Sequence, residues 1–288
     1  RAPKFPSPHN LLFLLRYWKR MGEKNALNMV EHTLRNMRLG GIFDHIGLGF
    51  HRYATDKEWR IPHFEKMLYD QALISTAYTE AYQATDNRFY AETAREIFEY
   101  VLSSLQSEEG GFYSAEDADT EGVEGKYYVW GPQELADILT EDEYGFFHTL
   151  FDLVPAENVG RAAGTNRTGP MILVLKDTIR NLAQQKGEPF EQVSSHWDRI
   201  RWKLNEMRSR RVRPFKDDKI LADWNGLMIA GLAKGYRILK EARYKKAAEE
   251  AMSFVLSELL QEDGTLRHMY REGSSAIEGN LNDYIYIL

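Results

Sequence analysis

Residues 40–70 are rich in side chains that can transfer protons, with three histidines and three aspartates in one short stretch. An imidazole exchanges protons near neutral pH, which suits the acid–base steps that epimerise or isomerise a sugar. Ordinary packing does not require so many polar and aromatic groups. We therefore predict catalytic roles for His45, His51 and His63, together with Lys66, Asp70 and Asp44.

Carboxylates indicate a second reaction. Glycoside hydrolysis uses two carboxylates, closer together for retention of configuration and farther apart for inversion. The carboxylates available for it are Asp44, Asp70, Asp117, Asp119 and Asp223. The residue types leave epimerisation and hydrolysis both open.

Aromatic rings near these groups could pack against the C–H faces of a sugar. Trp59 and Tyr113 are the better aromatic candidates because they lie in loops. The full set predicted to bind substrate is Arg52, Trp59, Tyr69, Tyr113, Glu116, Asp117, Asp119, Asp223, Trp224 and Asn225.

The sequence predicts no cofactor and no metal site. It has no cysteine and no His-Glu-x-x-His spacing. The run from Asp117 to Gly122 begins like a calcium-binding EF-hand loop, but its twelfth position is Tyr128, which cannot supply the bidentate carboxylate.

Lys66 and Asp70 are spaced by one helical turn, and Pro62 suits the first position of a helix. Both charges begin an otherwise apolar stripe. Because burial of a lone charge is costly, we expect the two to pair or to face a wet cavity. A buried ion pair that only stabilises the helix is the alternative.

The same pattern returns later in the chain. Lys66 and Asp70 match Lys219 and Asp223, 153 residues on, and a series of apolar and glycine positions matches at a spacing of 154. We interpret this as a duplicated helix pair with a repeated inward-facing ion pair.

A helical periodicity runs through most of the chain. Helices are predicted at 9–21, 24–38, 63–84, 88–106, 132–139, 141–151, 176–186, 188–210, 219–240 and 243–261. Strand-like signal, as at 126–130, is best interpreted as short hairpins in the loops. Tandem hairpins with long loops on one side form either an open solenoid or a closed α/α toroid, and the long loops rich in glycine and aromatic residues favour the toroid. The prediction is an all-α, incomplete α/α toroid that forms one domain over residues 1–288.

Composition excludes several classes of partner. A net charge of −6 without a broad basic face argues against nucleic acid, and no apolar run approaches the length of a membrane span. The absence of cysteine gives no support for an oxidising compartment, so we expect a cytoplasmic protein. The arginines at 208, 210, 211 and 213 either offset the negative end of a helix or grip an anionic group of a ligand.

The two ends favour a portion of a longer protein. The chain begins at Arg1 without Met and stops within 281–288, an apolar run that reads as a helix barely begun.

Several motifs resemble one family. They are Ala2-Pro3-Lys4-Phe5-Pro6, the stretch 40–70, Gly111-Phe112-Tyr113-Ser114-Ala115-Glu116-Asp117-Ala118-Asp119, Glu124-Gly125-Lys126-Tyr127-Tyr128-Val129-Trp130, and the stretch 217–227. They are similar to the helical part of the thioredoxin-domain-containing proteins related to spermatogenesis-associated protein 20. Residues 158–170 and Asn282-Asp283-Tyr284 depart from the family's pattern.

The resemblance implies a helical region similar to six-hairpin glycosidases and N-acylglucosamine 2-epimerases. It also implies an upstream thioredoxin-like domain as partner, which this chain lacks together with its cysteines. Three hypotheses follow: a sugar epimerase or isomerase with its ligand in a central funnel, a glycosidase-like hydrolase, and a non-catalytic scaffold or sugar-binding module. Neither nucleic acid nor a membrane is an expected partner.

Overall fold

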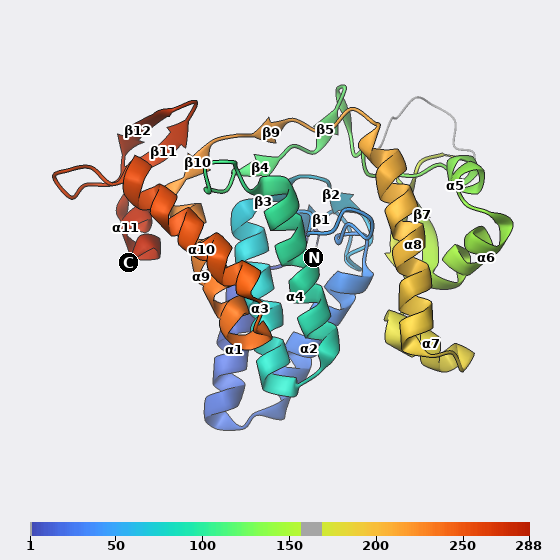
Figure 1. Ribbon diagram of the computed structural model, residues 1–288. Coiled ribbons are helices and arrows are strands. Elements are labelled where there is room, and N and C mark those ends of the chain that lie inside the picture. The colour runs from blue at the N-terminus through green and yellow to red at the C-terminus, as the bar shows by residue number, and fades with distance from the viewer. Residues whose placement is uncertain (1, 157–168) are drawn as a thin grey trace. The chain divides into compact units, whose positions relative to one another are not determined.

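The computed structural model describes residues 2–156 and 169–288, in which helices dominate and short strands connect them (Figure 1). Contacts divide these residues into two compact units. Unit 1 holds residues up to 5, 35–65 and 117–215, and unit 2 holds 6–34, 66–116 and 216–288. The prediction of one domain over 1–288 stays a prediction. Most of the divergent stretch 158–170 lies outside the described residues.

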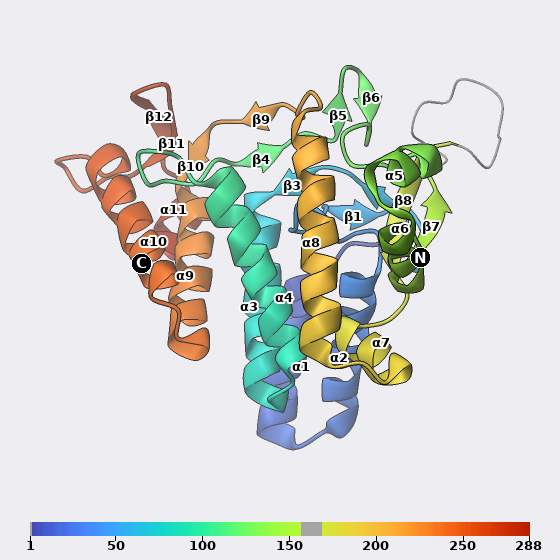
Figure 2. The same ribbon diagram turned by 45° about the vertical axis from the view of Figure 1, so that its right-hand side comes forward.

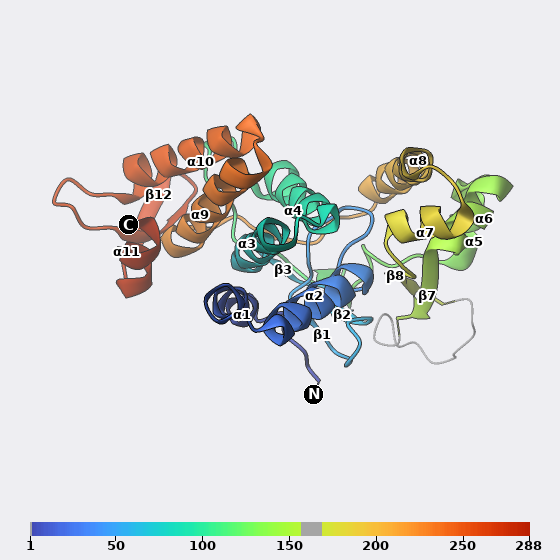
Figure 3. The ribbon, with the colours of Figure 1, turned by 90° about the horizontal axis from the view of Figure 1, so that it is seen from below.

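Unit 2 is a set of antiparallel helix pairs. Its helices are α1 (Pro8–Met21), α3 (Leu68–Thr85), α4 (Arg88–Tyr100), α9 (Ala222–Leu239), α10 (Ala242–Phe254) and α11 (Leu281–Ile287), with single π-helical turns η1 (Val101–Leu105) and η2 (Val255–Leu259). Its strands are β3 (Lys66–Met67), β4 (Ala115–Glu116), β9 (Lys216–Asp217), β10 (Ile220–Leu221), β11 (Arg267–Arg271) and β12 (Ser274–Glu278). Within this unit α9 packs between α3 and α11, as the view along the helices shows (Figure 3).

The bounds of these elements show the predicted duplication. Helix α3, helix α4 and turn η1 recur 154 residues later as α9, α10 and η2 with the same lengths. Both inner helices also stop in the same way, because Asp86 and Lys240 adopt left-handed backbone conformations with φ of 55° and 64°. The repeat therefore extends from the apolar pattern to the helix ends.

The start of each inner helix differs from the prediction. Helices were expected to begin at 63 and 219, but α3 and α9 begin at Leu68 and Ala222, because the preceding residues are extended and pair with other strands. Lys66 lies opposite Glu116 in the antiparallel pair β3–β4. In the second copy Lys219 pairs with Asp217 at 2.8 Å, so the expected repeat of the ion pair with Asp223 is wrong.

Unit 1 is built around a long helix and a hairpin. Its elements are β1 (Tyr53–Ala54), β2 (Pro62–His63), β5 (Asp119–Thr120), β6 (Val123–Glu124), α5 (Pro132–Ile138), α6 (Glu141–Leu150), β7 (Phe151–Pro155), β8 (Met171–Leu175), α7 (Ile179–Lys186) and α8 (Phe190–Ser209). Helix α2 (Lys24–Leu39) crosses the division between the units. Helix α8 packs against α7 and α6 (Figure 2) and buries Trp197, Ile200 and Leu204 against Phe147 and Phe151.

The all-α class is confirmed, with short hairpins in the loops. The strand expected at 126–130 is wrong: that stretch is mostly turn, and the hairpins β5–β6 and β7–β8 flank it instead. None of the described helices combines the length and apolar character needed to cross a membrane.

A glycine contact between α9 and α11 gives a test of this packing. A Cβ on Gly226 would lie 2.3 Å from the carbonyl oxygen of Tyr286. Gly226→Ala should therefore force the two helices apart and lower the free energy of unfolding by about 1–3 kcal/mol. Gly145→Ala at an exposed position of helix α6 is the control, because its Cβ meets nothing within 4 Å and helix propensity favours alanine by about 0.5–1 kcal/mol. Equal urea midpoints for the two variants would contradict the packing.

Candidate functional site

The predicted site residues fall in both units. Unit 1 holds Asp44, His45, His51, Arg52, Trp59, His63, Asp117 and Asp119. Unit 2 holds Lys66, Tyr69, Asp70, Tyr113, Glu116, Asp223, Trp224 and Asn225. The prediction that the acid–base groups of both sets form one catalytic site stays a prediction.

Asp44 belongs to a buried ion pair inside unit 1. Its Oδ1 accepts hydrogen bonds from the backbone N–H groups of Ile46 and Gly47, and Nη1 of Arg208 donates to the same atom at 2.9 Å. Both side chains are about 95% buried or more, at 5% and 3% exposure. Burial alone would lower the pKa of Arg208, but the charge and hydrogen bond of Asp44 raise it instead. The arginine thus grips a carboxylate of the chain itself.

His45 is held as a neutral ring. Its Nε2 donates to the carbonyl oxygen of Gly40 at 3.0 Å, and its Nδ1 accepts from Nη1 of Arg38 at 3.1 Å. Burial, with the positive charge of Arg38, lowers the pKa of His45 to about 3. Such a group exchanges no protons near neutral pH, so its geometry favours a structural role.

The other two histidines differ in access to solvent. His51 is 1% exposed, its Nδ1 donates to the carbonyl oxygen of Phe64 at 2.9 Å, and its ring meets those of Phe64 and Tyr128 edge-on. His63 keeps a quarter of its side chain exposed, stacks on Tyr53 and lies 2.7 Å from Oε1 of Glu124. Of the three imidazoles, His63 alone has the access that a ligand would need.

The space around the buried residues of unit 1 is small. Asp44, His45, His51, Tyr128 and Trp130 surround a cavity of about 20 Å³. A site for a small ligand usually offers about 300–1,000 Å³, so this space matches a single water molecule in size.

The predicted binding residues of unit 1 also differ in exposure. Trp59 is 3% exposed, with Nζ of Lys4 4.2 Å above its ring, and its predicted contact with a ligand stays a prediction. Arg52 pairs with Glu65 at 2.8 Å. Asp117 and Asp119 are exposed, and Asp117 uses one oxygen to accept the N–H of Ala118.

Lys66 belongs to a buried network in unit 2. It is 1% exposed, its Nζ lies 4.4 Å from the centre of the Tyr100 ring, and the Tyr100 hydroxyl donates to Oε2 of Glu116 at 2.7 Å. Asp70 follows in the first turn of α3 and is 7% exposed. The ring of Tyr100 thus stabilises the buried ammonium group by a cation–π contact.

Asn225 holds two segments of unit 2 together. Its Oδ1 accepts the N–H of Phe112 at 2.8 Å, and its Nδ2 donates to the carbonyl oxygens of Phe112 and Leu221. The side chain is fully buried. Both its amide groups thus bond to the backbone of the chain, and its predicted contact with a substrate stays a prediction.

Tyr69 and Trp224 do come together. They lie on the first turns of α3 and α9, and their ring centres are 4.8 Å apart at an interplanar angle of 67°. Both are half-buried, and each is adjacent in sequence to an acid of the predicted site, Asp70 or Asp223. The first turns of α3 and α9 thus each carry an aromatic residue next to an acid, in opposite order, because Tyr69 aligns with Asp223 and Asp70 with Trp224 at the 154-residue spacing.

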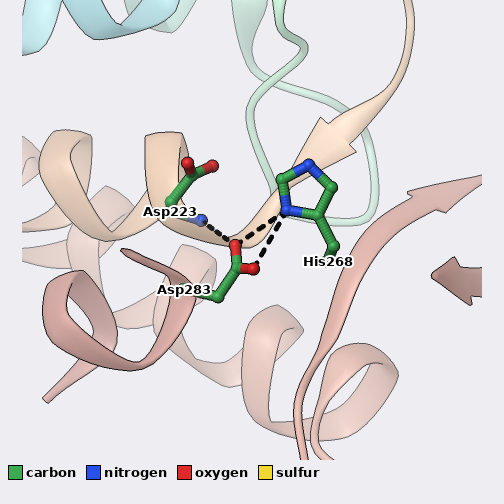
Figure 4. A group of neighbouring side chains, drawn as sticks. All are labelled: Asp223, His268 and Asp283. Atoms are coloured by element: carbon green, nitrogen blue, oxygen red, sulfur yellow. Dashed lines mark hydrogen bonds and ion pairs between the residues drawn. The ribbon is translucent and has the colours of Figure 1, made fainter. Parts of the chain in front are cut away.

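Asp223 has two neighbours that the sequence analysis did not select. His268 on β11 and Asp283 on α11 lie beside it, with the possible ligand atoms of all three within 4.8 Å of one another (Figure 4). Burial, and then the negative charge of Asp283, raise the pKa of Asp223. The signal that could have found His268 is its distance of 154 residues from Ser114, in the loop that the first copy uses to return to Lys66.

Two larger cavities lie elsewhere in the described residues. One of about 580 Å³ in unit 2 is lined by Ser107, Glu109, Glu250 and Phe254, among others. One of about 450 Å³ in unit 1 is lined by Tyr127, Val129 and Arg211, among others. None of the residues predicted to be catalytic or to bind substrate lines either cavity, but Arg211 is one of the arginines expected either to offset a helix end or to grip an anionic group.

Similarity to known proteins extends over the whole chain. No protein-family model matches the sequence. Human spermatogenesis-associated protein 20 is 35% identical over 317 residues, which cover all of this chain and 40% of the human protein. The mouse protein of the same name is 40% identical over 253 residues, which cover 81% of this chain and 32% of its own length. The chain thus spans less than half the length of these relatives.

Solved structures with a similar fold include sugar-processing enzymes. An α-1,6-mannanase variant of Salegentibacter aligns with 88% of this chain and 47% of its own, at a TM-score of 0.45 and 10% identity. The cellobiose 2-epimerase of Spirochaeta thermophila aligns with 96% of this chain and 81% of its own, at a TM-score of 0.37 and 16% identity. At this level of similarity no residue of this chain is matched to a residue of theirs.

Proposed function

Starting from a chain that belongs to the family of proteins related to spermatogenesis-associated protein 20, we propose that its duplicated helix pair binds a sugar or sugar derivative and processes it by epimerase or isomerase chemistry. The observation that carries the proposal is the ring pair Tyr69 and Trp224, with Asp70 and Asp223 beside it. Half-buried aromatic faces with polar neighbours are suited to a pyranose ring, which has both C–H and hydroxyl groups.

The chemistry requires one group that moves a proton next to the opened sugar's carbonyl. Asp70 is one of the two predicted acids adjacent in sequence to the ring pair, and it follows Tyr69 in the first turn of α3. We assign proton transfer to its carboxylate. Lys66, held over Tyr100, contributes a fixed positive charge from the adjoining strand.

Replacing Tyr69 or Trp224 tests whether the ring pair binds the sugar. Trp224→Ala and Tyr69→Ala should each weaken sugar binding by about tenfold, because stacking and ring burial are worth about 1–1.5 kcal/mol. Saturation-transfer NMR of the full-length protein with neutral, amino and uronic sugars measures this. Trp202→Ala is the matched control, since Trp202 is 66% exposed on α8 of unit 1. Unchanged affinity for the sugar in both ring variants would contradict binding by the ring pair.

The reaction type has its own measurement. Incubation with a bound sugar in D₂O should introduce deuterium next to the carbonyl carbon, and Asp70→Asn should abolish that exchange while leaving binding in place. Release of a shorter saccharide without exchange would instead favour the glycosidase hypothesis. Absence of saturable binding of any tested sugar would favour the scaffold.

A further inference from the structure

The cluster of Asp223, His268 and Asp283 joins three elements that are far apart in the sequence. Asp223 begins α9, His268 lies on β11, and Asp283 lies in the first turn of α11, and all three belong to unit 2 (Figure 4). Nδ1 of His268 is 2.9 Å from Oδ1 and 3.0 Å from Oδ2 of Asp283. One nitrogen and two carboxylates thus converge on a small volume.

The chain holds Asp283 in a fixed orientation. Its Oδ1 accepts the backbone N–H of Asp223 at 3.1 Å, and its Oδ2 accepts that of Asn280 at 2.7 Å in a capping box. The carboxylate is fully buried. A carboxylate oxygen can accept two hydrogen bonds, or one hydrogen bond while it binds a cation. Since each oxygen of Asp283 accepts one backbone N–H, each can still bind a cation on the side of His268.

The charges in the cluster are unbalanced. Two carboxylates are buried, at 8% and 0% exposure, against a single imidazole that keeps 23% of its side chain exposed. Burial of two negative charges side by side is costly without a compensating cation. A divalent cation would neutralise both carboxylates, whereas one imidazolium neutralises at most one.

We infer that Asp223, His268 and Asp283 bind a divalent transition-metal ion of the zinc or manganese class. The ion takes the place of the proton at Nδ1 of His268, and the carboxylate of Asp223 rotates to complete the set. A site with one imidazole and two carboxylates suits such ions, whereas magnesium and calcium prefer oxygen ligands alone. Three protein ligands leave a position open to a substrate oxygen.

The role of the ion rests on the proposed function. Asp223 is adjacent to Trp224 of the ring pair, so an ion here would act as a Lewis acid on the carbonyl of a stacked, opened sugar. Metal binding itself needs no sugar, so the metal site and the sugar site can fail separately.

Calorimetric titration of the chelator-treated chain with Zn²⁺ tests the site. One ion should bind per chain, at least tenfold more tightly than Mg²⁺ or Ca²⁺, and Co²⁺ should give visible d–d absorption bands. Asp223→Asn is the main variant because it keeps the side chain's shape and its acceptor for the N–H of Trp224. It should weaken Zn²⁺ binding at least tenfold, and His268→Ala should abolish it.

His9→Ala is the matched control, because His9 is an exposed histidine on α1 of the same unit. It should leave the stoichiometry and affinity unchanged, and circular dichroism should confirm that all variants are folded. Zn²⁺ binding that persists in folded Asp223→Asn and His268→Ala would overturn the site, as would its absence in the parent chain. Sugar binding without metal binding would overturn this inference and leave the proposed function intact.

Discussion

Replacing Asp44 with asparagine should lower the free energy of unfolding of the chain by about 3–5 kcal/mol. The substitution keeps an oxygen for the N–H groups of Ile46 and Gly47 but removes the charge that compensates Arg208. The guanidinium would then remain buried at 3% exposure without its counter-ion. Urea unfolding at pH 7 measures the difference.

A double variant separates the ion pair from simple packing. Arg208→Met combined with Asp44→Asn should recover part of the loss, because no unpaired charge remains buried. Glu65→Ala is the control for an exposed ion pair and should cost less than about 1 kcal/mol, since Arg52 and Glu65 both keep contact with water. If the double variant is as unstable as the single one, the charge of Arg208 is not the cause.

Acid should destabilise unit 1 through His45. The pKa of His45 is about 3 in the folded chain, below its ordinary value of 6.5, so the unfolded chain binds the proton more readily. This contribution to stability is complete above pH 6.5 and is lost as the pH falls towards 3. At pH 4 the loss should be about 3 kcal/mol, because each pH unit in this window is worth about 1.4 kcal/mol.

His45→Gln isolates that contribution. Glutamine can offer a donor to the carbonyl of Gly40 and an acceptor to Arg38, but it does not titrate. Its stability should fall by about 3 kcal/mol less than that of the parent chain between pH 7 and pH 4, in a series of urea unfolding curves. Identical pH profiles for the two proteins would show that His45 is not buried as a neutral ring.

The helix pairs were predictable because their signal is local. Apolar positions at helical spacing and the match at 153–154 residues indicated the elements and their duplication. The starts of α3 and α9 were not predictable, since Lys66 and Ile220 pair with strands that are distant in sequence. Helical periodicity carries no information about such pairing.

For the ionisable residues too, the sequence determined some properties and tertiary structure decided others. The sequence determined that Asp44, His45 and Lys66 are present at a density that packing alone does not need. Tertiary structure decided that His45 is buried neutral, that Asp44 pairs with Arg208, and that Lys66 lies over Tyr100. The cost of burying a charge depends on partners that the fold brings from up to 164 positions away.

The ring pair and the cluster of Asp223, His268 and Asp283 were predictable only in part. The sequence selected Tyr69 and Trp224 as aromatic residues suited to a sugar face and Asp223 as an acid, and the structure brings the two rings to 4.8 Å. His268 and Asp283 were not selected, because their contact with each other depends on how β11 and α11 pack at the start of α9. A repeat encoded in the chain determines which residues are equivalent, whereas only the packing of distant segments decides which charges share one site.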